Sequence, residues 1–198
     1  TMEFGMQIVT RGPEAGRPAF EALAKKAEET GLERIWASDH LILPAITKGS
    51  RHPTDPRGQM PETWKPRYYQ PFSVLNFLAG LTTRVRLGTS VVIVPMRNPI
   101  ELAAQVTELD QMSGGRFDFG IGVGWYREEF EALGYDFTNR GKRMDEALAL
   151  MKVLWSDGLA SFDGDYHSFA DAIMEPKPVQ KPHPPIYIGG GSIHAMRR

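Results

Sequence analysis

The chain has 198 residues, of which 41% are hydrophobic and 24% charged, and its net charge of −1 leaves no basic excess for nucleic acid or an anionic membrane. It has no cysteine, which excludes disulfides, thiolate metal sites and a cysteine nucleophile. The length favours one domain over residues 1–198, and the lack of a leader peptide or long apolar span predicts a cytoplasmic location.

The first forty residues are typical of a strand, a helix and a strand. An apolar run over residues 4–10 ends at a glycine-proline breaker, and residues 18–31 carry an apolar stripe at helical spacing that closes at a glycine. A second strand is predicted over residues 33–38, with Asp39 and His40 directly after it. Together these elements predict one parallel βαβ unit.

Residues 41–70 form a long connection that contains prolines and, near its end, Trp64, Tyr68 and Tyr69. Connections of this length inside a compact domain are usually functional or disordered, and the aromatic residues argue against plain disorder. We expect a lid or a substrate wall, with an insertion that has no role as the alternative. A helix is predicted to begin at Pro71.

The stretch 84–125 predicts a strand, a helix and a further strand. Residues 85–94 are apolar and β-branched, as in a strand covered on both faces, and Asn98 with the following proline begins a helix that ends at 113–115. In residues 117–123, bulky residues alternate with Asp118 and glycines. The bulky face should pack outward on helices, and the glycine face either leaves room for a flat ligand or only relieves crowding in the barrel.

The remaining chain continues the alternation of helices and strands. Helices are predicted over residues 126–133 and 140–155, then a hairpin whose tight turn centres on Asp163 and Gly164, and a strand at 186–188. Such alternation predicts a parallel α/β fold of barrel or open-sheet type. Five main strands are recognisable, whereas a closed eight-stranded barrel takes about 250 residues, so we expect only part of a barrel.

Ligands of such folds bind at the C-terminal ends of the strands. There, residues 189–192 offer free backbone N–H groups suited to phosphate, or simply turn the chain. His40 suits proton transfer near neutral pH, or is structural with Asp39 as an N-cap. Glu128 and Glu129 are expected to complement a helix dipole, and the remaining histidines lack metal-ligand spacing.

At these strand ends the sequence resembles the bacterial luciferase-like superfamily, and within it the branch that uses the deazaflavin coenzyme F420. The motifs that carry the resemblance follow one another over nearly the whole chain: Trp36-Ala37-Ser38-Asp39-His40, Leu87-Gly88-Thr89-Ser90-Val91, Asn98-Pro99, Ser113-Gly114-Gly115-Arg116, Gly120-Ile121-Gly122-Val123-Gly124-Trp125, Phe162-Asp163-Gly164 and Pro184-Pro185-Ile186-Tyr187-Ile188-Gly189-Gly190. Each motif alone is weak, and together they are specific.

The resemblance implies a (β/α)8 TIM barrel with F420, or alternatively FMN, in its C-terminal mouth, and a homodimer. Ser90 and Val91 would be joined by a non-proline cis peptide that backs the ring, Asp39 would contact the ring's polar edge, and His40 would act near the redox carbon. The glycines of the fourth strand, Gly122 and Gly124, would leave space for the ring. The last glycine run would hold the phosphate of the cofactor: Gly189, Gly190, Gly191 and Ser192.

Two departures from the family pattern matter. Trp125 stands where some sugar-phosphate dehydrogenases of the superfamily carry a glutamate, so sugar oxidation is disfavoured. The family also continues for several βα units beyond the position of Ser192, which would leave the barrel and the cofactor site incomplete here and suggests that the chain is truncated.

The sequence therefore predicts an F420-dependent oxidoreductase that transfers a hydride between the deazaflavin and a small organic substrate. One alternative is an FMN-dependent monooxygenase, because reduced flavin activates oxygen whereas the deazaflavin is confined to hydride chemistry. Another is a barrel that binds a flavin without turnover, and a metal-dependent hydrolase is disfavoured by the lack of ligand spacing.

Overall fold

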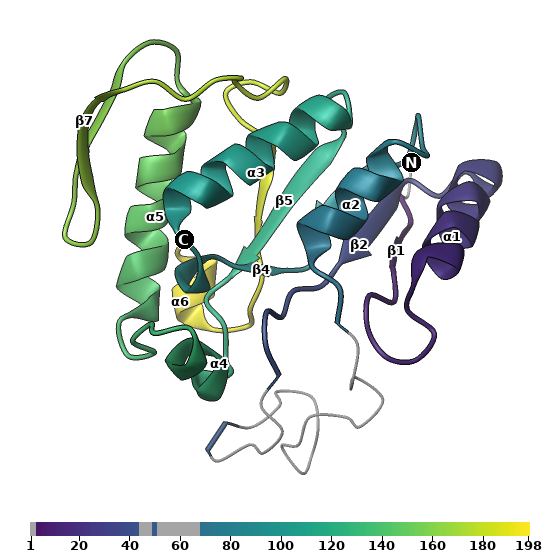
Figure 1. The fold of residues 1–198 in the computed structure, drawn as a ribbon, viewed down its shortest axis with the longest axis horizontal. Coiled ribbons are helices and arrows are strands. Elements are labelled where there is room, and N and C mark those ends of the chain that lie inside the picture. Colours follow the sequence, from purple (N-terminus) through teal and green to yellow (C-terminus); the bar gives the residue numbers. More distant parts are fainter. Residues whose placement is uncertain (1–2, 44–48, 51–67) are drawn as a thin grey trace.

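The computed structural model describes residues 3–43, 49–50 and 68–198, along which helices and strands alternate (Figure 1). In chain order the elements are β1 Gly5–Gln7, α1 Arg17–Thr30, β2 Arg34–Ala37, α2 Pro71–Ala79, β3 Arg86–Thr89, β4 Val92–Ile93, a 3₁₀ turn Val94–Met96, α3 Pro99–Met112, β5 Phe117–Gly122, α4 Arg127–Ala132, α5 Arg140–Trp155, β6 Ala160–Asp163, β7 Ser168–Ala172, β8 Ile186–Ile188 and α6 Ile193–Met196.

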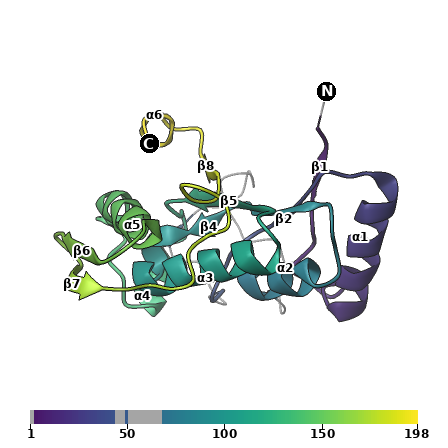
Figure 2. The same cartoon turned by 90° about the horizontal axis from the view of Figure 1, so that it is seen from above.

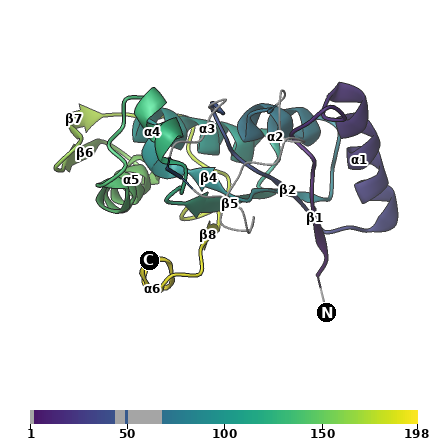
Figure 3. The same ribbon diagram turned by 90° about the horizontal axis from the view of Figure 1, so that it is seen from below.

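A parallel six-stranded sheet forms the centre of the molecule. Its order is β1-β2-β3-β5-β4, with β8 also paired to β5, and every neighbouring pair is parallel. Figures 2 and 3 show α2 and α3 on one side of this sheet and α6 on the other. Helices on one face of a parallel sheet are the arrangement of a barrel wall, so the predicted α/β class is confirmed.

Helix boundaries follow the local signals in the sequence. The side chain of Asn98 caps α3, with Oδ1 accepting from Ile100 N at 2.9 Å. Gly31 ends α1 in the left-handed region at a φ of 73°, where a residue without Cβ is favoured. These ends confirm the predicted helices at 18–31 and after Asn98.

The bulky face of β5 packs on the helices, as its alternation predicts. Phe117 and Phe119 are fully buried, and their rings lie 6.2 Å from Phe72 of α2 and 6.3 Å from Trp155 of α5. The core therefore lies between the sheet and the helices that cover it.

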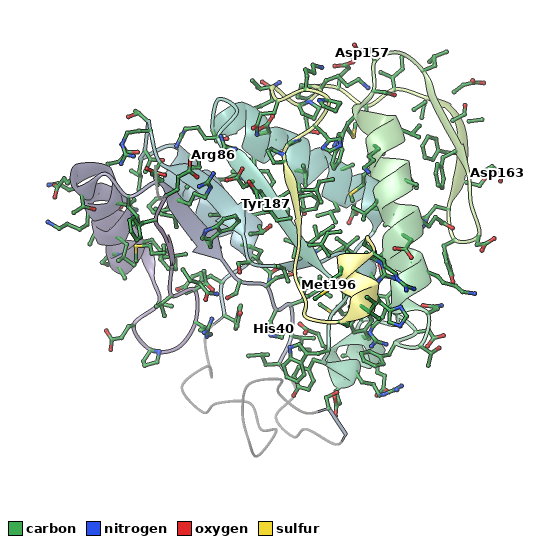
Figure 4. All side chains as sticks on the ribbon, turned by 180° about the vertical axis from the view of Figure 1, so that it is seen from behind. His40, Arg86, Asp157, Asp163, Tyr187 and Met196 are labelled. Carbon is green, nitrogen blue, oxygen red and sulfur yellow. The ribbon has the colours of Figure 1, made fainter. Side chains whose placement is uncertain are left out.

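The opposite face of the sheet, which a closed barrel would turn inward, carries large and charged side chains. Asp118 is buried and accepts from Arg34 Nε at 3.1 Å and Arg86 Nη2 at 2.5 Å. On the same face, the rings of Trp36 and Tyr187 meet edge to face at 5.8 Å. Figure 4 shows Arg86 and Tyr187 on the face turned away from α2 and α3. These side chains lie on this face near the N-terminal ends and the middle of the strands.

Two predicted boundaries are wrong. Residues 85–94 do not form one strand, because β3 ends at Thr89 and β4 begins at Val92, with a cis peptide bond between Ser90 and Val91. The resemblance implied this cis bond, but the apolar pattern alone did not reveal the break. The hairpin turn lies at residues 164–167 and not at Asp163-Gly164, since Gly164 N donates to His167 O at 3.0 Å.

Candidate active site

A cavity of about 320 Å³ opens at the C-terminal end of the sheet. Its size lies at the lower end of the range for small-molecule sites, roughly 300 to 1,000 Å³. The lining comes from segments far apart in the sequence: Gln7, Arg11, Ser38, Asp39, His40, Tyr68, Ser90, Val91, Ile93, Met96, Gly124, Trp125, Tyr126, Glu129 and Phe130. The cavity thus joins the ends of β1, β2, β3 and β5, where a ligand of a parallel α/β fold is expected.

His40 and Glu129 form a buried pair at this cavity. His40 follows β2 and its Nδ1 lies 2.7 Å from Oε2 of Glu129, which is on α4. The side chains are only 8% and 1% exposed. Around the imidazole, the rings of Tyr68, Trp125 and Tyr126 stand edge-on at 5.2 to 6.3 Å between centroids. Imidazole in a largely aromatic wall, held by a carboxylate, is an arrangement suited to proton transfer.

Asp39, next in the chain to this histidine, has both carboxylate oxygens engaged by protein groups. Oδ1 accepts from Arg97 Nη2 at 2.6 Å, and Oδ2 accepts from the backbone N–H of Ile93 at 2.9 Å. Burial raises the pKa of Asp39, while Arg97 and the Ile93 N–H oppose that rise. The side chain therefore ties the end of β2 to β4. Contact between Asp39 and a cofactor ring stays a prediction.

Polar groups gather at a second corner of the cavity. Ser38 Oγ lies 2.7 Å from the Tyr68 hydroxyl and 3.3 Å from Thr10 Oγ1, and it accepts from Arg11 Nη1 at 3.1 Å. Burial raises the pKa of Tyr68, with the Ser38 hydrogen bond opposing it, so the phenol is neutral at ordinary pH. This corner offers hydroxyl groups and a guanidinium to the polar end of a ligand.

The glycine face of β5 is filled by protein atoms, so the expected empty space is absent there. A Cβ on Gly120 would lie 1.8 Å from the carbonyl oxygen of Thr89, and one on Gly122 would lie 2.7 Å from Val91 Cγ2. The same valine would meet a Cβ on Gly189 at 2.8 Å through Cγ1. The glycines thus admit the Ser90-Val91 bulge, which corrects the expectation that they vacate space for a ring. Relief of crowding, the alternative left open, is what the geometry supports.

Only some of the predicted cofactor-binding residues line the cavity. Ser90, Val91 and Gly124 line the cavity together with Asp39 and His40, whereas Gly122 does not. Gly190, Gly191 and Ser192 are exposed and also lie outside its lining, although Gly189 lines a smaller space of about 200 Å³ beside Val91. Ser192 Oγ accepts from Ala195 N at 3.2 Å and so caps α6. Phosphate binding by 189–192 remains a prediction.

The cavity residues fit a flat tricyclic ring. Trp125 and Tyr126 are stacked at 4.8 Å with 7° between their planes, and Val91, Ile93 and Met96 add apolar wall. Apolar and aromatic walls with a few polar groups are what a ring with one polar edge requires. The side chains that would hold such a ring are therefore those of the bulge and the aromatic wall.

The segment 41–70 lies mostly outside the described residues, so its role as a lid is untested. Of its last residues, Tyr68 lines the cavity and Gln70 Nε2 donates to the carbonyl of His40 at 2.6 Å. Gln70 Oε1 accepts from Arg97 Nη2 at 3.1 Å. The end of the segment is therefore anchored beside the candidate site.

Residues 3–43, 49–50 and 68–198 contain neither a cluster of metal-binding side chains nor a membrane-spanning helix. Among these, no three His, Asp or Glu side chains lie together as metal ligands would. None of the helices formed by the same residues combines the length and apolar character needed to cross a bilayer.

Sequence reasoning missed Glu129 and Arg97. The sequence predicts that Glu129, like Glu128, complements a helix dipole, but Glu129 is buried and bonded to the candidate catalytic histidine. Extending the list of strand ends by one helical turn past Tyr126 would have included it. Arg97 had no local signal, since its partner Asp39 is 58 residues away.

Comparison with known proteins gives a consistent family match. The family model described as luciferase-like monooxygenase matches residues 2–198. An uncharacterized protein of Mycobacterium tuberculosis (strain H37Rv) is 32% identical over 168 residues, which cover 85% of this chain and 59% of that protein. The oxygenase component of flavin-dependent trigonelline monooxygenase from Acinetobacter baylyi is 34% identical over 168 residues, covering 84% and 41%.

Among solved structures, an F420-dependent secondary alcohol dehydrogenase in complex with an F420-acetone adduct superimposes with a TM-score of 0.71 at 25% identity. The match covers 93% of this chain and 51% of that one. The chain thus spans about three fifths, or less, of the relatives it matches. The TIM-barrel type of fold predicted from the sequence is confirmed.

Proposed function

The chain belongs to the luciferase-like monooxygenase family, and we propose that the protein is an F420-dependent oxidoreductase that exchanges a hydride with a small organic substrate. The observation that carries this proposal is the buried His40–Glu129 pair at the wall of an aromatic cavity. Members of the family named above use either a flavin or F420, which supports a ring cofactor of this class.

When bound, F420 supplies a two-electron acceptor or donor of hydride. Oxidation of an alcohol to a carbonyl releases a proton together with the hydride, and a nearby base is then needed for the hydroxyl proton. His40 would take this proton at Nε2 as the carbonyl forms, and would return it in the reverse reaction. A substrate with a carbinol or carbonyl group therefore suits this site.

Other side chains would bind and orient the reactants. Val91 and the stacked pair Trp125 and Tyr126 would hold apolar ring surface and exclude water. Tyr68 and Arg11, at the polar corner, would take the oxygen-bearing end of a bound molecule. The same residues would serve an FMN-dependent monooxygenase, which is the second candidate because the relative from A. baylyi is named as flavin-dependent.

The test is titration of the full-length protein with F420 and, separately, with FMN, following ring fluorescence. We expect saturable binding of F420 and weaker binding of FMN. Tighter binding of FMN would move the function to oxygen chemistry, and binding of neither would contradict both candidates.

A second measurement separates hydride transfer from oxygenation and from binding alone. We expect substrate to reduce bound F420 in the absence of oxygen, and turnover in air to consume no oxygen. His40→Ala should lower kcat by about 10²- to 10⁴-fold, the usual worth of a general acid or base. Exposed His194 on α6 offers the matched control, and His194→Ala should keep kcat. A rate unaffected by His40→Ala would favour a different proton carrier. The absence of any turnover would favour a protein that binds the cofactor without catalysis.

A further inference from the structure

We propose that Glu129 is a positioning residue that fixes the orientation and the tautomer of His40. The catalytic consequence of this role rests on the proposed function, whereas the tautomer itself does not. The pair joins two elements that are far apart in the chain, since His40 follows β2 and Glu129 lies on α4. Figure 4 shows His40 at the end of the sheet near α4.

The carboxylate of Glu129 is held by more than the histidine. Its Oε1 accepts from the backbone N–H of Leu41 at 2.6 Å and of Ile42 at 3.1 Å, while Oε2 lies 2.7 Å from His40 Nδ1. All the donors therefore come from the chain directly after β2. Because these contacts engage both oxygens, the carboxylate is held with Oε2 toward the imidazole.

This arrangement determines which ring nitrogen of His40 carries hydrogen. An oxygen that accepts from two N–H groups is best satisfied as part of a carboxylate, and a carboxylate only accepts. The hydrogen of the Oε2 contact then belongs to Nδ1. A neutral imidazole protonated at Nδ1 has its lone pair at Nε2, which is the atom that receives the proton in the proposed reaction.

The neighbouring residue shows that the effect belongs to position 129. Glu128 is one helical step away and its Oε1 accepts from Gly49 N at 2.8 Å and Ser50 N at 3.2 Å. Successive helical residues point about 100° apart, so only one of the two glutamates meets His40. Glu128 and Glu129 thus form a matched pair with the same side chain and the same helix.

A carboxylate behind a catalytic imidazole acts by selecting the tautomer and stabilising the imidazolium that forms. In metal sites, loss of the carboxylate that accepts a hydrogen bond from a ligating histidine lowers metal affinity or activity by about 10- to 100-fold. We expect Glu129→Gln to lower kcat by about 100-fold while KM changes by less than about threefold, because Glu129 contributes through His40 and not through contact with substrate.

The decisive test needs no cofactor or substrate. In Glu129→Gln the amide oxygen still accepts from Leu41 and Ile42, but the amide nitrogen now donates to His40 Nδ1 and forces hydrogen onto Nε2. Imidazole ¹⁵N chemical shifts of the histidine-labelled full-length protein report the tautomer directly. We expect the Nδ1–H form in the wild type and the Nε2–H form in Glu129→Gln, with Glu128→Gln unchanged.

Each outcome decides one part of the proposal. The signals of His40 are identified among the five histidines by their loss in His40→Gln. An Nε2–H tautomer in the wild type, or no change in Glu129→Gln, overturns the positioning role. A changed tautomer with unchanged kcat overturns its catalytic consequence. If the tautomer changes but F420 does not bind, the proposed function fails and the positioning role stands.

A second variant keeps the test decisive if the amide variant does not fold. Glu129→Asp retains the carboxylate but shortens its reach, so it should keep the Nδ1–H tautomer and recover part of kcat. If Glu129→Asp instead gave the Nε2–H tautomer, a carboxylate at this position would not determine the tautomer, and the proposal would be wrong.

Discussion

At the scale of single residues, the site depends on buried charges that protein groups neutralise. The carboxylate of Asp39 is completely buried, and the side chain of Arg97 that meets it is 12% exposed. Breaking one half of such a pair leaves a charge without a partner, which costs more than the pair itself contributes. Asp39 and Arg97 therefore hold the cavity wall in place.

Replacing Arg97 by methionine tests this interpretation. We expect Arg97→Met to lower the free energy of unfolding by about 3 kcal/mol at pH 7.5, measured by urea denaturation. Burial already raises the pKa of Asp39 above 3.8, and the loss of Arg97 removes the main opposing influence. A group with a raised folded-state pKa stabilises the fold at low pH and loses that contribution as pH rises through the folded pKa.

The deficit of Arg97→Met relative to the wild type should thus be smaller at pH 5 than at pH 7.5. The double variant Asp39→Asn with Arg97→Met removes the unpaired charge and should recover part of the loss. An equal deficit at both pH values would show that Arg97 acts through packing and not through charge.

At the scale of elements, close backbone approach decides which positions are glycine. Residues 120 and 122 face the β3 and β4 segments so closely that a Cβ at either one would overlap protein atoms. The alternating sequence revealed the strand and its small face, but it contains no information on what occupies that face. That face is occupied by the bulge between β3 and β4, which belongs to a different part of the chain from β5.

Gly120→Ala should therefore be among the most damaging substitutions in the sheet. The added Cβ would lie 1.8 Å from the Thr89 carbonyl oxygen, so β3 or β5 must move. Overpacking of this kind costs about 3 kcal/mol or more, which thermal or urea denaturation detects. Gly191→Ala is the control, since a Cβ there meets nothing within 4 Å. Similar stability of the two variants would contradict the packing described for β5.

The hairpin β6-β7 is held against α5 by one glutamate. Glu146 accepts from Asp165 N at 2.6 Å, from Tyr166 N at 3.0 Å and from His167 Nδ1 at 3.1 Å. Burial raises the pKa of Glu146, and the His167 and backbone hydrogen bonds outweigh it, so the net pKa is lowered. Its carboxylate therefore stabilises the fold more than its protonated form does.

We expect Glu146→Gln to lower the free energy of unfolding by about 1 to 2 kcal/mol at pH 6.5. A lowered folded-state pKa gives stability that is present above the unfolded value of 4.5 and lost as pH falls through the folded pKa. The difference between wild type and Glu146→Gln in urea should accordingly shrink toward pH 3. A difference independent of pH would mean that the charge of Glu146 contributes nothing.

At the scale of the whole molecule, the sequence predicts elements well and contacts between them poorly. Helices at 18–31 and 140–155 follow from local periodicity and end signals, and the structure confirms them. The pair of His40 and Glu129 is separated by 89 residues, so no local pattern could join them. The predicted site residues are those that lie at strand ends, such as His40, whereas Glu129 lies on a helix.

The cavity also links stability to ligand binding, because its walls come from β1, β2, β3, β5 and α4. A ligand that binds only this assembled form stabilises the whole fold by about 2.7 kcal/mol at a concentration of 100 times Kd. We expect F420 to raise the melting temperature of the full-length protein with a dependence on ligand concentration that gives the same Kd as fluorescence.

The same measurement tests the predicted phosphate contact of Gly189, Gly190, Gly191 and Ser192. Backbone N–H groups at such a turn bind the phosphate of the cofactor and not its ring, so the deazaflavin ring lacking phosphate should produce a smaller shift at equal concentration. Ser192→Pro, at a φ of −87° that proline can adopt, removes one of these N–H groups and should reduce the shift with F420 while leaving the shift with the bare ring unchanged. Equal shifts for both ligands would indicate that these residues only turn the chain, and that binding depends on the aromatic wall and the Ser90-Val91 bulge.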